Sequence, residues 1–395
     1  MAAKVAVRIG VAVLSSLTLL SGASVAAAAK AKPPIKIGEI AALTGPTALT
    51  GLQEQLGAKL AVAQINAKGG LLGRKVQLIT LDFGGQVPNG VEDYRRLAAD
   101  DHVSAVIGTN FSNVNIAFAP LTSTYKVPNL SDAIDLRATI QHNGKAYPYS
   151  FLAQPSATDW GVAMAKVALH VLKKKTVGIL VNQDNAFATA QEGPFVSYFK
   201  RHGGKVVSIQ QYPTTATQYQ TYLTNIIAAQ PQLLLLTDYG QQDGMQAQEA
   251  RQLGFKGKIL GPNTMSTASY TSVAGSYASG TWFVNNVDMR LPRFRAFNTA
   301  FYKMFDAPPA TTNAVFGYDD VNLIADAIRA GRSATPASIT KQLDRLVNQP
   351  VLEGAGTFTM SRKFHRPLYM PVTIFEWVNG KAVDKGPMST NPNQK

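Results

Sequence analysis

One short polar loop carries side chains suited to holding a small carboxylate. Residues 108–113 read Gly-Thr-Asn-Phe-Ser-Asn, after an apolar run and before another over residues 114–121. Hydroxyls and backbone N–H groups are the donors that a carboxylate needs, above all where a helix begins and adds positive potential. We therefore expect Asn110, Phe111 and Ser112 in a ligand site. The structural alternative for Ser112 is a plain helix cap.

Residues for catalysis or metal binding are not grouped in this way. The chain has no cysteine. The glycine-rich residues 69–75 lack the spacing of a phosphate-binding loop and lead into a strand, and no Gly-x-Ser-x-Gly elbow occurs. We expect no enzyme, no catalytic residue, no metal and no cofactor. No paired metal-ligand spacing is found among the histidines, which are His102, His142, His170, His202 and His365.

The pattern of strands and helices around the polar loop occurs twice in the chain. A strand beginning at Gly73, a helix near residues 89–100 and a strand over 103–108 are matched by a strand beginning at Gly203, a helix over 219–229 and a strand over 233–236. Each unit has the size of a strand–helix–strand motif. Ligands bind beyond the carboxyl ends of such strands. Two facing sheets would place residues 110–112 and 238–241 on opposite walls of one cleft.

The N-terminal segment has the pattern of an export signal. Lys4 and Arg8 precede the apolar residues 9–20, which are too few to span a bilayer, and small residues follow over 24–29. We expect a cleaved signal peptide over residues 1–29 and a periplasmic protein without stable membrane insertion. The alternative is a retained membrane anchor.

Composition argues against a nucleic-acid partner. The net charge is +14, or +12 without Lys4 and Arg8, but the basic residues are scattered. The longest basic run, residues 173–175, suits the negative end of the helix that it closes.

The sequence of residues 35–82 resembles that of the leucine/isoleucine/valine-binding proteins of bacterial ABC importers. The resemblance lies in Thr44-Gly45-Pro46, in Ile65-Asn66-Ala67-Lys68-Gly69-Gly70 and in Leu72-Gly73-Arg74-Lys75, and it continues to about Lys381. It implies an α/β fold of two Rossmann-like lobes, each with a doubly wound, mostly parallel sheet, joined by three hinge crossings (a type I periplasmic binding protein).

The expected lobes are discontinuous in sequence. We place residues 35–151 and 285–354 in a first lobe and residues 152–284 and 355–385 in a second. Residues 386–395, with two prolines and several Asn, Ser and Thr, are expected to form a flexible tail.

The resemblance also implies ligand contacts. A serine at the Ser112 position holds the ligand carboxylate together with the next loop, residues 127–135, which includes Ala133. On the opposite wall a tyrosine at the Tyr239 position closes on the ligand, and an aromatic residue at the Phe187 position contacts it. Thr50 stands where some members carry an aromatic side chain.

One position departs from the family pattern. Amino-acid-binding members commonly carry an acid after the Gly-Pro of residues 261–262, as counter-charge for the ligand ammonium, and this chain has Asn263. Either Asp135 or Asp132 supplies the missing charge, with Asp184 and Asp238 as further candidates, or the ligand has no ammonium group. A buried ammonium without a partner would cost several kcal/mol.

These observations predict the binding component of an ABC importer, which captures a small carboxylate between two closing lobes. The ligand is an amino acid if Asp135 faces the cleft, and otherwise an aromatic or aliphatic acid or an amide. The importer's permease subunits are the expected partners of a monomeric protein. A ligand-sensing module for a signalling receptor is the alternative, and an exported hydrolase is the remote one.

Overall fold

The computed structural model describes residues 32–394. The signal peptide expected over residues 1–29 lies outside the described residues. All contacts discussed below lie within Pro33–Lys395, which forms one unit by its internal contacts. None of its described helices combines the length and apolarity that crossing a bilayer requires.

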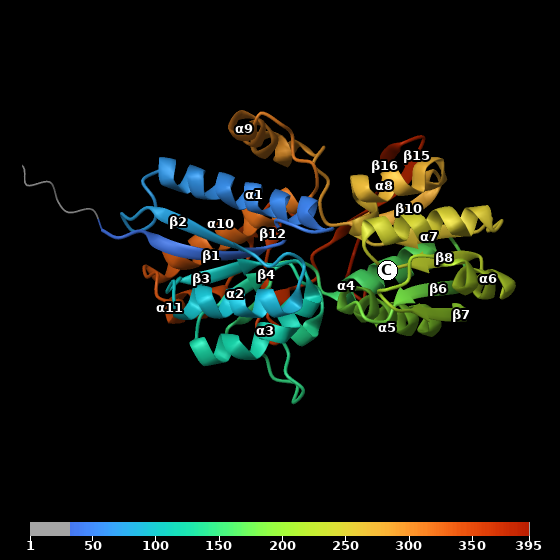
Figure 1. Cartoon of the computed structure of the whole chain (residues 1–395), viewed down its shortest axis with the longest axis horizontal. Coiled ribbons are helices and arrows are strands. Elements are labelled where there is room, and N and C mark those ends of the chain that lie inside the picture. Colours follow the sequence, from blue (N-terminus) through green and yellow to red (C-terminus); the bar gives the residue numbers. More distant parts are fainter. Residues whose placement is uncertain (1–31, 395) are drawn as a thin grey trace, which may run out of the picture. The chain divides into compact units, whose positions relative to one another are not determined.

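The first sheet is five-stranded and parallel, in the order β2-β1-β3-β4-β5 (Figure 1). Strands β1 and β3 place apolar side chains on both faces, which is typical of a parallel sheet covered by helices. The strands are β1 (Ile35–Ala41), β2 (Val76–Asp82), β3 (Ala105–Gly108), β4 (Asn129–Ser131) and β5 (Ser150–Leu152).

Helices cover both faces of the first sheet. Ile37 and Ile107 pack with α1, α10 and α11, whereas Ile40 and Val106 pack with α2 and α3. These helices, with α9 beside them, are α1 (Ala48–Ala67), α2 (Val87–Ala99), α3 (Ser112–Tyr125), α9 (Arg295–Phe305), α10 (Asn313–Gly331) and α11 (Pro336–Leu343).

Helices α1 and α10 approach closely because glycines lie at their contact. A Cβ at Gly57 would lie 1.8 Å from the carbonyl oxygen of Ala314, and one at Gly317 would lie 2.1 Å from that of Glu54. No larger residue fits at either position without a shift of the helices. This close approach brings acidic residues of the two helices near each other.

The second sheet is seven-stranded, in the order β16-β15-β10-β9-β8-β6-β7. Strands β6 to β10 form parallel pairs, and β15 and β16 add antiparallel pairs at one edge. The strands are β6 (Thr176–Asn182), β7 (Lys205–Tyr212), β8 (Leu233–Leu236), β9 (Lys258–Gly261), β10 (Thr281–Asn285), β15 (Val372–Val378) and β16 (Lys381–Met388).

The four leucines of β8 show how this sheet is covered. Leu233 and Leu235 pack with α4 and α5, while Leu234 and Leu236 pack with α6, α7 and α8. The predicted α/β fold with two mostly parallel sheets is therefore confirmed. The helices are α4 (Ala157–Lys166), α5 (Ala186–Arg201), α6 (Gln220–Ala228), α7 (Gly240–Gln252) and α8 (Ala268–Ala274).

The chain passes between the sheets three times: after β5, after β10 and between β12 and β15. We call the first sheet with its helices lobe 1 and the second sheet with its helices lobe 2. We propose that each lobe, with the residue bounds predicted from the sequence, moves as a rigid body. Two short hairpins lie near the last passage, β11 (Gln349–Pro350) with β12 (Thr357–Phe358) and β13 (Met360–Ser361) with β14 (Arg366–Pro367).

The C-terminal segment differs from the flexible tail expected over residues 386–395. Strand β16 continues to Met388, and Thr390 is fully buried. The Lys166 ammonium donates to the backbone oxygens of Ser389 and Asn391. Polar composition suggested a free tail, but strand pairing and these bonds to a buried lysine fix the segment against lobe 2.

Candidate functional site

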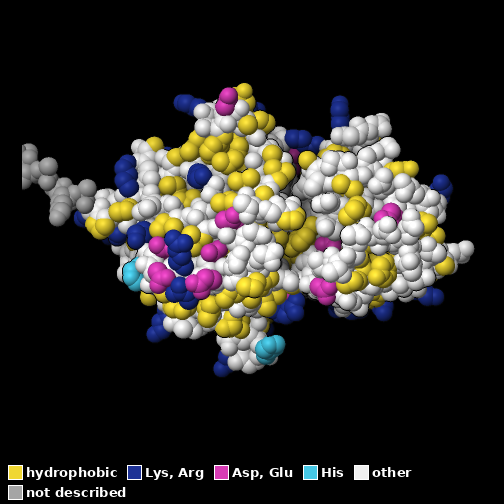
Figure 2. Space-filling model, in the orientation of Figure 1, with side chains coloured by type: hydrophobic (Ala, Val, Ile, Leu, Met, Phe, Trp, Pro, Cys, Tyr) yellow, Lys and Arg dark blue, Asp and Glu magenta, His cyan; other side chains and the backbone are white. Residues whose placement is uncertain are grey.

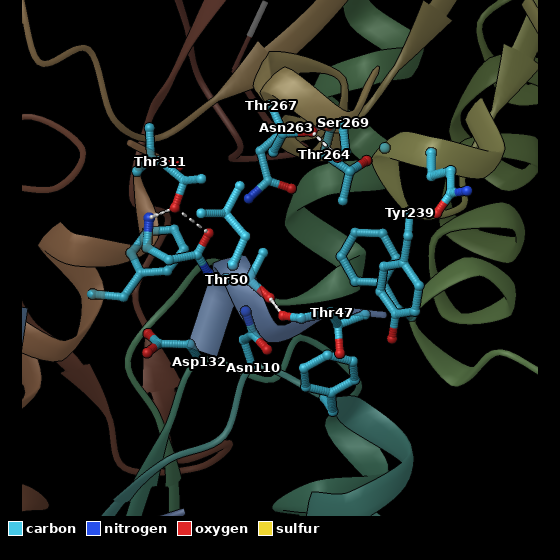
Figure 3. Close-up of a pocket in the computed structure, with 18 of the residues that line it drawn as sticks. Thr47, Thr50, Asn110, Asp132, Tyr239, Asn263, Thr264, Thr267, Ser269 and Thr311 are labelled. Carbon is cyan, nitrogen blue, oxygen red and sulfur yellow. Dashed lines mark hydrogen bonds between the residues drawn. The ribbon is translucent and has the colours of Figure 1, made fainter. Parts of the chain in front are cut away.

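A cavity of about 160 Å³ lies between the two lobes (Figure 3). Lobe 1 contributes residues around the starts of α1, α3 and α10, and lobe 2 contributes residues around the starts of α7 and α8. The carboxyl ends of parallel strands meet the starts of helices at this edge of each sheet. The cavity therefore lies where the doubled strand–helix pattern predicts a ligand site.

Four long helices direct their N-termini at the cavity. Thr47 and Thr50 line it at the start of α1, Asn110 at α3, Gly240 at α7 and Asn313 at α10. The first N–H groups of a helix have no partner within the helix, and the peptide dipoles place positive potential there. The site thus offers positive potential to an anionic group without a cationic side chain.

Aromatic rings form one wall and join the lobes. The rings of Phe111 from lobe 1 and Tyr239 from lobe 2 have centroids 5.6 Å apart, and Phe187 lies 5.5 Å from Tyr239. Burial raises the pKa of the Tyr239 hydroxyl, so it stays protonated at neutral pH. This wall offers flat apolar area to a ligand and closes only when the two lobes are together.

Hydrogen bonds reinforce the contact between lobes beside this wall. The Asn113 side chain, at the start of α3, donates to the backbone oxygen of Asp184 (3.0 Å) and accepts from the backbone N–H of Ala186 (2.8 Å). Both partners belong to the turn that begins α5 in lobe 2. One asparagine thus carries two bonds that depend on the relative position of the lobes.

Four of the hydroxyls that line the cavity donate hydrogen bonds to oxygen atoms of the protein. Thr50 donates to the Thr47 carbonyl (2.6 Å), Thr264 to the Asp238 carbonyl (2.9 Å), Thr267 to the Thr264 carbonyl (2.8 Å) and Thr311 to the Asn313 amide oxygen (3.2 Å). A hydroxyl has one proton, so what these groups can offer a ligand is lone pairs.

Asp132 is the one charged side chain among the described residues that line the cavity. It is 1% exposed, and neither carboxylate oxygen has a hydrogen-bond partner. Burial raises the pKa of this carboxyl to about 7, while the neighbouring Asp320 and Gln154 side chains partly offset the rise. In Figure 3 the side chain lies on the floor of the cavity beside Asn110.

Asp132 belongs to a group of buried acids that we call the carboxyl cluster. Burial is the largest cause that raises the pKa of each member, to about 7 for Glu39 and about 8 for Asp319. Mutual repulsion raises the pKa of several of them further, so the cluster holds protons to a higher pH than ordinary carboxyls do. The members are Glu39, Glu54, Asp132, Asp319, Asp320 and Glu353.

Six of the nine residues predicted from the sequence line this cavity. They come from both lobes and from separate parts of the chain, and Figure 3 labels four of them. The structure thus brings together Thr50, Asn110, Phe111, Phe187, Tyr239 and Asn263.

Ser112 does not line the cavity. It is fully buried, and its hydroxyl oxygen accepts from the backbone N–H groups of Ile134 (3.3 Å) and Asp135 (3.4 Å). The hydroxyl therefore ties the start of α3 to the loop after β4. The expected direct contact with a carboxylate is replaced by support of the loop that carries Asp132.

Ala133 and Asp135 also lie outside the cavity lining. Ala133 is fully buried and packs with Ala138 and Leu152. The Asp135 carboxylate pairs with Arg137 at 2.5 Å and accepts from its backbone N–H at 2.8 Å. The sequence could not show that this aspartate caps the short helical turn that follows it.

The two other aspartates considered as counter-charges are occupied elsewhere. The Asp238 carboxylate accepts from Asn182, Asn185 and the Tyr212 hydroxyl within lobe 2. Asp184 accepts from the backbone N–H of Thr214. Of the acids named from the sequence, Asp132 is the one that lines the cavity.

The sequence missed the contribution of α10 and of Gln154. Thr311, Thr312 and Asn313 line the cavity next to Asp132, although they lie far along the chain from the other lobe 1 residues. A Thr-Thr-Asn group before an apolar helix is a visible N-terminus signal. The chain returns to lobe 1 before α10, and only the folded structure shows that this N-terminus faces the cavity.

A profile of the family described as periplasmic binding protein matches residues 34–382. A curated relative, Leu/Ile/Val-binding protein homolog 3 of Brucella melitensis, is 27% identical over 93% of this chain and 99% of its own length.

Solved structures share the fold. The leucine-binding protein LivK of Thermotoga maritima superposes with a TM-score of 0.81 at 21% identity, over 90% of this chain and 98% of that one. A solute-binding protein of Rhodopseudomonas palustris in complex with 3,4-dihydroxy benzoic acid has a TM-score of 0.77 at 19% identity, over 91% of this chain and 98% of that one. At these identities the likeness shows the fold alone.

Proposed function

The chain belongs to the periplasmic binding protein family, and from that premise we propose that it is the substrate-binding component of an ABC importer. It would capture a small molecule in the cavity between its lobes and deliver it to permease subunits at the inner membrane. Export by a signal peptide over residues 1–29 and a monomeric state are parts of this proposal. The curated relative named for leucine, isoleucine and valine supports the transport role.

One observation carries the proposal: the cavity is walled by residues of both lobes. The Phe111–Tyr239 ring contact and the two bonds of Asn113 all cross between lobes. A ligand bound here touches both lobes and therefore favours the state in which they are together. Capture by closure, followed by release on opening, is the behaviour that an importer needs from its binding component.

We propose a small organic carboxylate as the ligand class, either an amino acid or another organic or aromatic acid. The four helix N-termini offer N–H groups and positive potential for the carboxylate. The wall of Phe111, Phe187 and Tyr239 offers apolar area for the remainder. A cavity of about 160 Å³ limits the ligand to a small molecule.

A thermal-shift screen of the mature protein tests this function. The panel contains branched-chain amino acids, aromatic acids including 3,4-dihydroxybenzoate, short organic acids and amides. A ligand at a hundred times its Kd stabilises the folded state by about 2.7 kcal/mol, which raises the Tm. We expect at least one class to do so, and Tyr239→Ala to abolish the rise.

The matched control is Tyr277→Ala, which removes an exposed tyrosine far along lobe 2. It should leave the ligand-induced rise intact. Equal rises in wild type and Tyr239→Ala would show that ligands bind elsewhere, and a panel without any stabilising compound would overturn the proposed ligand class.

A further inference from the structure

Among the described residues, the cavity between the lobes is lined by one carboxyl side chain and by no basic side chain. Among the described lining residues, Asp132 is acidic, and neither lysine, arginine nor histidine is present. Helix N-termini can hold an anionic group, but they leave Asp132 without a complement. A ligand that fills the cavity must either neutralise this carboxylate or leave it buried and unpaired.

The Asp132 carboxyl is built into the floor and has no donor of its own. It is 1% exposed, with both oxygens unpaired. The Gln154 amide donates to the Asp132 backbone oxygen (2.9 Å), which leaves the amide oxygen of Gln154 unpaired as well. Asn263 presents a third unpaired, buried acceptor at the same cavity. Buried acceptors without donors are rare in folded proteins.

The neighbouring acids favour a charge on Asp132 over a charge elsewhere in the carboxyl cluster. Burial and repulsion by Asp132 raise the pKa of Asp320, so Asp320 can hold a proton and share it with one Asp132 oxygen, which leaves the other oxygen open. Burial, and then repulsion by neighbouring acids, raises the pKa of Glu54 and Glu353 as well. In residues 32–394 no three acids or histidines are arranged to hold a metal ion. The Asp132 oxygen that stays open toward the cavity is available to a donor that a ligand brings.

The surrounding hydroxyls point to the same conclusion. The protons of Thr50 and Thr311, both drawn above Asp132 in Figure 3, are committed to protein oxygens. What these two hydroxyls can offer a ligand is lone pairs. A group that donates several hydrogen bonds and carries positive charge, such as a primary ammonium, matches acceptors of this kind.

We propose that Asp132 is the counter-charge for a ligand ammonium group, so that the ligand is a small zwitterionic amino acid. The inference rests on the proposed function and narrows its ligand class. The counter-charge lies in lobe 1, whereas the family pattern places an acid at the Asn263 position in lobe 2. The ligand ammonium is thus held by lobe 1 before lobe 2 closes on it.

Calorimetric titration of matched compound pairs tests this assignment. Each pair is an amino acid and the same skeleton without its amino group: L-leucine with 4-methylpentanoate, and L-phenylalanine with 3-phenylpropanoate. We expect an amino acid to bind wild type and its deaminated partner to bind at least about thirtyfold more weakly, since an unpaired buried charge is left behind. Asp132→Asn should weaken the amino acid by a similar factor.

Asp306→Asn is the matched control, because Asp306 is an exposed residue after α9 whose left-handed backbone suits asparagine. It should bind like wild type. Acids without an amino group that bind as tightly as the amino acids would overturn the inference and leave the proposed function standing. A loss in Asp135→Asn but not in Asp132→Asn would also overturn it. If neither pair binds, the amino-acid class itself is wrong.

The pH profile separates a charge partner from a structural role. Binding of an ammonium requires ionised Asp132, so wild-type affinity should fall about tenfold for each pH unit below 7. Asp132→Asn should show a flat profile. The other groups facing Asp132 are Asp319 and Asp320 on α10, Glu54 on α1 and Glu353, and burial raises the pKa of each. A pH dependence that survives in Asp132→Asn would assign the titration to those groups.

Discussion

Ser112 illustrates how a buried side chain can position a cavity residue without lining the cavity itself. Its hydroxyl accepts two backbone N–H groups from the loop after β4, and that loop carries Asp132. Removing the hydroxyl leaves two buried donors without a partner, which costs about 1–3 kcal/mol. The residue therefore contributes mainly to stability and to the position of Asp132.

We predict that Ser112→Ala lowers the free energy of unfolding by about 1–3 kcal/mol, as measured by urea denaturation of the ligand-free protein. Ligand affinity should fall by less than about tenfold, since no ligand contact is lost. Ser272→Ala, which alters an exposed serine on α8, is the control. Unchanged stability with abolished binding would instead make Ser112 a direct ligand contact.

At the scale of elements, the start of α3 couples the ligand site to the contact between lobes. Phe111 supplies a ring to the cavity wall, and Asn113, two residues later, bonds to the start of α5. The N-terminus of α3 therefore lines the cavity and also contacts lobe 2. This arrangement makes closure and binding favour each other.

We predict that Asn113→Ala shifts the lobes toward the open state. Two hydrogen bonds of about 0.5–1.5 kcal/mol each are lost, so the Kd for the best ligand should rise roughly five- to a hundredfold. Asn225→Ala on the outer helix α6 is the control, and titration calorimetry is the measurement. A Kd equal to that of the control would show that these bonds do not contribute to closure.

The elements were largely predictable from the sequence because local signals specify them. Apolar runs such as residues 233–236 and glycine-marked helix ends predict strands and helices, and the repetition of the unit predicts facing sheets. The approach of α10 to the cavity depends on close packing at Gly57 and Gly317, which no local pattern shows. For the same reason, Asp132 could not be separated from Asp135 as the acid that lines the site.

For the molecule as a whole, the carboxyl cluster links stability to pH. Its members have folded-state pKa values above those of the unfolded chain, to about 7 for Asp132 and Glu39 and about 8 for Asp319. The folded state therefore binds more protons than the unfolded state between about pH 4 and pH 8. Over that range, stability should fall as the pH rises.

We predict that the Tm of the ligand-free protein is several degrees higher at pH 5 than at pH 8, as measured by scanning calorimetry. Glu54→Gln removes one cluster carboxyl and should flatten this dependence. Glu92→Gln is the matched control, because that exposed glutamate pairs with Arg95, which lowers its pKa. A Tm that rises with pH in wild type would contradict the protonated state of the cluster.

We expect the exposed charged residues to contribute little to the dependence of stability on pH. Figure 2 shows charged side chains dispersed over the visible face, with a local group of both signs over lobe 1. Arg95 on α2 of lobe 1 forms ion pairs with Glu92 and Asp100. Exposed pairs of this kind contribute little to stability. The pH response should therefore come from buried acids, which include the carboxyl cluster and Asp243.

The most direct test of the central claim is whether a ligand draws the two lobes together. Because the chain has no cysteine, Lys68→Cys at the end of α1 and Lys256→Cys in lobe 2 allow two dyes to be attached specifically for single-molecule energy transfer. The compound that raises the Tm most should shift the population to one shorter dye-to-dye distance, and Tyr239→Ala should reduce that shift. A distance distribution that stays unchanged while the compound still raises the Tm would contradict capture between closing lobes.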